Sequence, residues 1–83
     1  MRMQSEAFPL ADEIRSRINK IRDLYGVETS VEISINVGQD GNHTLMILYF
    51  KGVPISNLVP QQFIATPKEV SGKILPILNS LLK

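Results

Sequence analysis

The sequence predicts a small α+β domain in the order α-β-β-(β)-α, with an antiparallel hairpin sheet packed against two helices. Three observations support this fold class. Apolar residues recur at helical spacing over residues 9–25 and again over 67–82, and residues 31–51 resemble two strands around a turn. A chain of 83 residues has the length of one small domain, so we expect a single domain over 1–83.

The first element is predicted to be a helix over residues 9–25, after a short polar leader. Its apolar stripe follows spacings of four, four, three and four along Leu10, Ile14, Ile18, Ile21 and Tyr25. Pro9 suits the first helical position, because its missing N–H would have no helical partner there. Gly26 is expected to end the helix in the left-handed conformation, with Val27 making the hydrophobic contact that follows such an end.

Two strands, over about 30–38 and 43–51, are predicted to form a hairpin. In the first strand apolar and polar side chains alternate, which is typical of a strand with one buried face. The turn over 38–42 contains Asp-Gly, a dipeptide that tolerates the positive φ of tight turns. The second strand does not alternate, because residues 45–50 are all apolar.

The second strand therefore has two apolar faces in either register of the hairpin. A two-residue turn at Asp40-Gly41 places Ile35 opposite Met46, and the side chains facing away from the core are then Leu45, Ile47 and Tyr49. A three-residue loop instead turns outward Met46, Leu48 and Phe50. A large apolar side chain left exposed forgoes roughly 1.5–3 kcal/mol. We expect a second copy, a partner or residues 52–65 to cover this face.

The segment after the hairpin contains two prolines and a glycine, and it has two interpretations. A short third strand over 53–58 would lie at a sheet edge, because Pro54 has no N–H to donate. Such a strand is favoured because two strands alone make a marginal sheet. The alternative is an irregular loop that packs apolar residues onto the core, namely Ile55, Leu58, Val59, Phe63 and Ile64.

The last predicted element is a helix over about 67–82. Thr66 and Glu69 match a capping box, in which each side chain bonds the backbone N–H of the other residue. Apolar residues cover an unusually wide arc of this helix, at Val70, Ile74, Leu75, Ile77, Leu78, Leu81 and Leu82. Pro76 lies inside the pattern and removes one helical hydrogen bond, so we expect a kink there.

The composition narrows the available chemistry. There are no cysteines, and His43 is the only histidine, beside a turn. The glycines are explained by the hairpin, a helix end and the kink, with no phosphate-binding loop. We therefore predict that the chain is not an enzyme and has no catalytic residue, metal or cofactor. With no signal-like or membrane-length apolar run, we expect a cytoplasmic protein that does not contact a membrane.

Nucleic-acid binding has little support in the sequence. The predicted order of elements resembles the layout of double-stranded-RNA-binding domains, a family that places a lysine cluster at the start of the last helix. Here Lys68 stands there beside Glu69, and the net charge of the chain is only +1. RNA binding is therefore the third hypothesis.

The leading hypothesis is a small regulatory protein, a non-enzymatic interaction module that acts by protein–protein binding. It would be an inhibitor or adaptor that binds an unidentified protein and forms a homodimer. The predicted interface residues are Leu45, Ile47, Tyr49, Leu75, Leu78 and Leu82. The alternative is a binding module for a small anionic ligand, such as a nucleotide, at a dimer interface. The residues predicted for that ligand are Tyr49, Lys51, Arg15 and Arg22.

Overall fold

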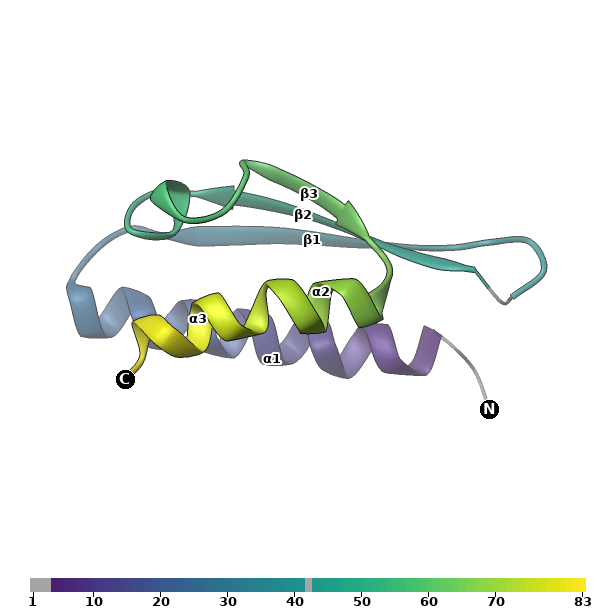
Figure 1. Cartoon of the computed structure of the whole chain (residues 1–83), viewed down its shortest axis with the longest axis horizontal. Coiled ribbons are helices and arrows are strands. Elements are labelled where there is room, and N and C mark those ends of the chain that lie inside the picture. Colours follow the sequence, from purple (N-terminus) through teal and green to yellow (C-terminus); the bar gives the residue numbers. More distant parts are fainter. Residues whose placement is uncertain (1–3, 42) are drawn as a thin grey trace.

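The computed structural model describes residues 4–41 and 43–83, and it shows a two-layer α+β domain. One antiparallel sheet has the strand order β1-β2-β3, and the helices α1, α2 and α3 lie on one side of it (Figure 1). The elements in chain order are α1 (Gln4–Tyr25), β1 (Ser30–Val37), β2 (Thr44–Lys51), β3 (Gln62–Ala65), α2 (Pro67–Lys73) and α3 (Leu75–Leu81). This arrangement confirms the predicted fold class. We call the helix-covered side of the sheet the inner face and the other side the outer face.

Helix α1 begins earlier than predicted, at Gln4 instead of Pro9. Ala7 continues the apolar stripe by one turn and is completely buried, so the additional turn packs against the rest of the domain. Pro9 lies inside α1, on its exposed side, so its ring does not interrupt the buried stripe. Residues 1–3 of the predicted leader lie outside the described part of the chain.

The end of α1 is built around Gly26, which has a φ of +65°. The N–H groups of Gly26 and Val27 both donate to the Arg22 carbonyl, at 2.9 and 3.3 Å. Tyr25 was expected on the buried stripe, but its side chain is exposed. Its hydroxyl donates to the Leu81 carbonyl at 2.8 Å, so this residue joins α1 to α3 through a polar contact.

The hairpin adopts the first of the two registers considered. Ile35 lies opposite Met46, and Ile33 lies opposite Leu48. On the inner face of β2 three side chains are buried almost completely, namely Met46, Leu48 and Phe50. The first register therefore gives β1 and β2 a common apolar face toward the helices.

The hairpin turn closes through the backbone. The Gly38 N–H donates to the His43 carbonyl, and the Gly41 N–H donates to the Gly38 carbonyl at 2.9 Å. His43 Nδ1 lies 2.6 Å from Asp40 Oδ2. Asn42, the last residue of the predicted turn, lies outside the described residues. The hairpin extends past the helices (Figure 1), and the molecule measures 42 × 21 × 17 Å.

The third strand forms at a different place from the one predicted. Residues 53–58 contain a 3-10 helix, η1 (Ile55–Asn57), and not a strand, while β3 lies further on. Ile55 is completely buried in the main core, which a compact turn achieves better than an edge strand would. The four residues of β3 alternate between the faces, with Phe63 opposite Leu48 and Ile64 opposite Ile47. The irregular loop was therefore the better interpretation for 53–58, but not for 62–65.

The last predicted helix is divided into α2 and α3 at Ile74, two residues before Pro76. The capping box is present at the start of α2. The Glu69 N–H donates to Thr66 Oγ1 at 3.3 Å, and the Thr66 N–H donates to Glu69 Oε1 at 3.2 Å. Both pieces lie on the inner face, where Pro67 and Val70 of α2, Leu78 of α3 and Ile74 between the two helices are buried.

Candidate functional site

The most distinctive surface of the molecule is an apolar strip on the outer face. Leu45, Ile47 and Tyr49 of β2 point to this face, and Ile64 of β3 is the cross-strand neighbour of Ile47. The side chains of Leu45, Tyr49 and Ile64 are 43%, 38% and 54% exposed. The helices all lie on the opposite face (Figure 1), so none of them covers these residues. We call these four residues the apolar strip.

Polar side chains border the apolar strip on both neighbouring strands. On β1 the outer-face positions hold Glu32, Ser34 and Asn36, which lie opposite Tyr49, Ile47 and Leu45 in that order. On the other side, Gln62 of β3 lies opposite Tyr49. Lys51 ends β2 on the same face. An apolar centre with a polar rim is the usual anatomy of a protein–protein interface.

The structure excludes one of the three covers that were considered for this face. Residues 52–65 do not cover the strip, because Ile55 and Val59 of that segment are buried in the main core. Ile64 of the same segment adds to the exposed apolar surface instead. The sequence interpretation missed Ile64 as a surface residue, although the adjacent strand-favouring residues Phe63 and Ile64 between two prolines are a weak signal of a short strand.

The interface residues predicted on the last helix need correction. Leu78 is completely buried within the monomer, so it has no surface to offer a partner. Leu75 and Leu82 are partly buried and pack against the same core. The wide apolar arc has a structural explanation, because α2 contacts both α1 and the sheet and α3 contacts α1 and α2. The three predicted β2 residues do lie on the outer face.

The residues predicted for an anionic ligand do not come together in one site. Tyr49 and Lys51 share the outer face, whereas Arg15 and Arg22 belong to α1 in the helix layer. Arg15 Nη1 lies 3.2 Å from Asp12 Oδ1, which is an exposed ion pair within α1. Arg22 Nε donates to the Thr29 carbonyl at 3.1 Å, where the chain enters β1.

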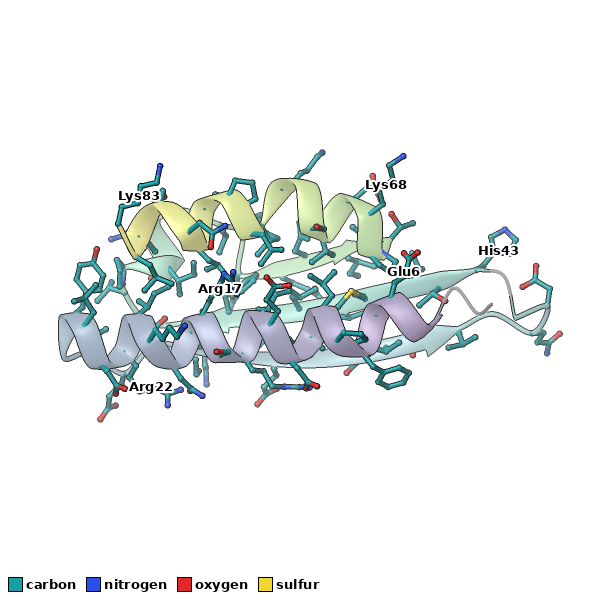
Figure 2. The ribbon with its side chains drawn as sticks, turned by 90° about the horizontal axis from the view of Figure 1, so that it is seen from below. Glu6, Arg17, Arg22, His43, Lys68 and Lys83 are labelled. Carbon is teal, nitrogen blue, oxygen red and sulfur yellow. The ribbon has the colours of Figure 1, made fainter. Side chains whose placement is uncertain are left out.

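Two adjoining hollows lie where α2 begins, and Figure 2 shows Glu6, Lys68 and His43 at this end of the molecule. The larger, about 590 Å³, is lined by Glu6, Leu10, Pro67, Lys68, Ser71 and Gly72. The smaller, about 260 Å³, is lined by Glu6, His43, Thr44, Leu45, Thr66, Pro67 and Lys68. Neither hollow contains the predicted ligand residues. Glu6 and Lys68 line both hollows, so their opposite charges offset each other and do not favour an anion.

Thr44 is the one polar detail of the smaller hollow that the fold does not explain. Its hydroxyl is buried and has no hydrogen-bond partner among the described residues. A hydroxyl by itself gives no chemistry without a base or an anion beside it. The hollow is therefore a weaker candidate for function than the apolar strip.

The charged groups of the described chain form no other evident site. No group of three His, Asp or Glu side chains in the described ranges is placed to hold a metal ion. No helix among these residues is long and apolar enough to cross a membrane. No protein-family model matches the chain, and no match was found among curated proteins or solved structures. The surface chemistry of the molecule is thus the guide to its function.

Proposed function

We propose that this chain is a small cytoplasmic interaction module, without enzymatic activity, that binds another protein and forms a homodimer through the apolar strip. The observation that carries this proposal is the apolar strip on the outer face, where Leu45, Tyr49 and Ile64 are exposed and Ile47 between them is partly buried. In β2, the outer face is as apolar as the inner one, yet none of the helices that the structure describes packs on it. A contiguous apolar patch with a polar rim is typical of a surface used for association.

The energetics favour a weak, concentration-dependent dimer. Covering the exposed part of a large apolar side chain returns on the order of 1 kcal/mol. The three exposed side chains on each copy would therefore return about 6 kcal/mol in total, against roughly 4–15 kcal/mol for lost rigid-body freedom. Because these two free energies are similar, we expect the dimer to form only at high protein concentration. A weak dimer of this kind could dissociate when one copy binds a partner protein.

The charges at the ends of the strip indicate how two copies would align. Glu32 and Lys51 lie at one end, while Leu45 and Asn36 lie at the uncharged end. A two-fold axis perpendicular to the strands places the charged end of one copy over the uncharged end of the other. An axis parallel to the strands would bring Lys51 toward its own symmetry mate, which disfavours that arrangement.

The test is the molecular mass in solution, measured by sedimentation velocity and light scattering over a wide concentration range. The wild-type chain should approach twice 9.3 kDa as its concentration rises. Leu45→Glu and Ile64→Glu should each stay near 9.3 kDa, because each introduces a charge into the strip. Leu24→Glu is the matched control, since Leu24 is exposed on α1, away from the sheet.

Two results would contradict the proposed dimer. One is a wild-type chain that stays monomeric at the highest concentration reached. The other is a dimer that Leu24→Glu disrupts as strongly as the two strip variants do, because the contact would then involve the helix layer.

A further inference from the structure

The free edge of β1 presents a row of unpaired backbone groups. In an antiparallel ladder, the residues that bond to the neighbouring strand alternate with residues that point away from it. The Gly38 N–H donates to the His43 carbonyl, so even-numbered residues of β1 bond to β2. The odd-numbered residues therefore direct their N–H and C=O groups outward, at Val31, Ile33, Ile35 and Val37. No strand in the described part of the chain lies on that side.

The other free edge of the sheet, strand β3, is protected against pairing with another chain. Strand β3 has four residues and is bracketed by Pro60 and Pro67. Strand β1 has eight residues and contains no proline, lysine or arginine, with Glu32 as its single charge. Short length, proline and charge are the devices that keep sheet edges from pairing with other chains. Of the two edges, β1 is the one suited to accept another strand.

The helix side of this edge is apolar and carries positive charge at one end. Phe8, Arg15 and Arg22 recur every seven residues, so they share one side of α1. Arg22 Nε donates to the carbonyl of Thr29, just before β1, so this side faces the β1 edge. Phe8 is exposed, and the inner-face side chains of β1 from Val31 to Ile35 are only half-buried.

A second copy of the whole domain does not fit this edge. Helix α1 packs along β1, and Figure 2 shows it lying over that strand when the molecule is seen from the helix side. Paired strands lie about 4.8 Å apart, whereas packed helices need roughly 8–10 Å between their axes. Pairing β1 with β1 of another copy would force the two α1 helices together. An extended segment without a helix beneath it has no such conflict.

We propose that β1 binds an extended segment of another protein as a fourth, antiparallel strand. The segment would place alternate apolar side chains beside Phe8 and the half-buried isoleucines, and polar ones beside Glu32 and Ser34. Its carboxyl-terminal end would lie near the start of β1. There it would carry a carboxylate to meet Arg22, which forms no ion pair within the described residues. This surface is separate from the apolar strip, and it does not depend on the homodimer.

The test uses a synthetic peptide of seven residues that alternates valine and threonine and ends in glutamate. The protein is the Leu45→Glu variant, so that self-association cannot mask or mimic binding. Amide hydrogen exchange, followed by NMR, should slow by roughly tenfold at Ile33 and Ile35 when the peptide is added. The amides of Glu32 and Ser34, already bonded to β2, should change little.

Two controls make the result specific. A peptide N-methylated on the amides that face β1 should not bind, and this control leaves the protein unchanged. Ile33→Pro removes one outward N–H of β1 and should abolish binding. Gln62→Pro removes an outward N–H of β3, since the Phe50 N–H bonds to the Gln61 carbonyl, and should leave binding intact.

Three outcomes would overturn the inference. They are an absence of slowed exchange at the outward amides, equal binding of the N-methylated peptide, and loss of binding in Gln62→Pro but not in Ile33→Pro. A peptide that ends in lysine should bind several-fold more weakly than the one that ends in glutamate. Equal affinity of these two peptides would remove the role given to Arg22.

Discussion

The two faces of β2 have the same chemistry and different surroundings. Met46, Leu48 and Phe50 are buried under the helices, whereas Leu45, Ile47 and Tyr49 lie on a face without helices. Both sets consist of large apolar side chains, so residue type alone does not decide which set forms the core. The position of the helices decides which set is buried, because α1, α2 and α3 all lie on the inner face (Figure 1). The apolar surface that the fold leaves uncovered is the basis of the proposed association.

The most direct test of this difference between the two faces of β2 is to introduce a carboxylate on each face in turn. Met46→Glu buries a charge without a partner, which costs several kcal/mol and consumes most of the roughly 5–15 kcal/mol that stabilises a small domain. We expect this variant to be unfolded at 25 °C by circular dichroism. Leu45→Glu should keep the fold and the cooperative urea transition of the monomer.

The neighbouring positions Met46 and Leu45 serve as controls for each other, since both lie in β2 and both variants introduce glutamate. Equal unfolding of both variants would contradict the comparison, because it would mean that the outer face is covered within one chain. Retention of the fold in Met46→Glu would contradict the burial of that side chain.

The second prediction concerns the turn that leads η1 back into the core. Gly52 has a φ of +85°, and a Cβ atom there would lie 2.7 Å from the Glu28 carbonyl oxygen. Gly52→Ala should therefore destabilise the domain by about 2 kcal/mol or more in urea unfolding. The strained turn would weaken the placement of Ile55, which is buried in the core.

Gly72→Ala is the matched control for Gly52→Ala. A Cβ atom at Gly72 would meet no other atom within 4 Å, and its φ is not in the left-handed region. Alanine is the better helix former, so this variant should be more stable than wild type by about 0.5–1 kcal/mol. Equal effects at the two glycines would show that the turn at Gly52 is not required.

Much of the inner face could be predicted from the sequence. Alternation in β1 and the buried stripe of α1 define the core, and each of the two hairpin registers gives a definite set of inward residues. Choosing between the registers required the closing pair Gly38 and His43, which depends on the loop geometry. Leu78 was assigned to an interface because a wide apolar arc looks the same whether it contacts two elements of its own chain or a partner.

The outer face was less predictable. Ile64 joins the strip only because β3 pairs with β2, a contact between residues far apart in the sequence. The 53–58 segment was assigned to a third strand because two strands alone make a marginal sheet, but the third strand forms at 62–65 and Ile55 is buried through a compact turn. The protection of one sheet edge and not the other depends on strand order, which a single sequence does not specify.

The third prediction concerns α2, part of the helical cover of the inner face. Thr66 Oγ1 accepts the Glu69 N–H at 3.3 Å, and this bond satisfies a donor at the start of the helix. Thr66→Ala should lower the free energy of unfolding by about 1 kcal/mol, measured in urea. Thr66→Ser keeps the hydroxyl and is the control, so it should lose much less stability than the alanine variant does.

The smallest expected effect is a dependence of this cap on pH. The N–H of Thr66, and then its hydroxyl, donate to the Glu69 carboxylate and hold the pKa of Glu69 below its ordinary value. A carboxyl group whose pKa is lower in the folded state stabilises the fold above the unfolded-state pKa. That stabilisation disappears as the pH falls through the lowered pKa.

Glu69→Gln isolates the contribution of this carboxylate, since it removes the titrating group and keeps a side chain that reaches the Thr66 N–H. In urea unfolding, wild type should have a higher free energy of unfolding than Glu69→Gln at neutral pH. This difference should be smaller in acid, where the wild-type carboxyl group is protonated. Glu32→Gln, on the outer face, is the charge control at a position that does not touch the helical cover. If this difference in the free energy of unfolding does not decrease in acid, the Thr66 hydroxyl alone stabilises the start of α2. The cover of the inner face would then be insensitive to the charge of Glu69.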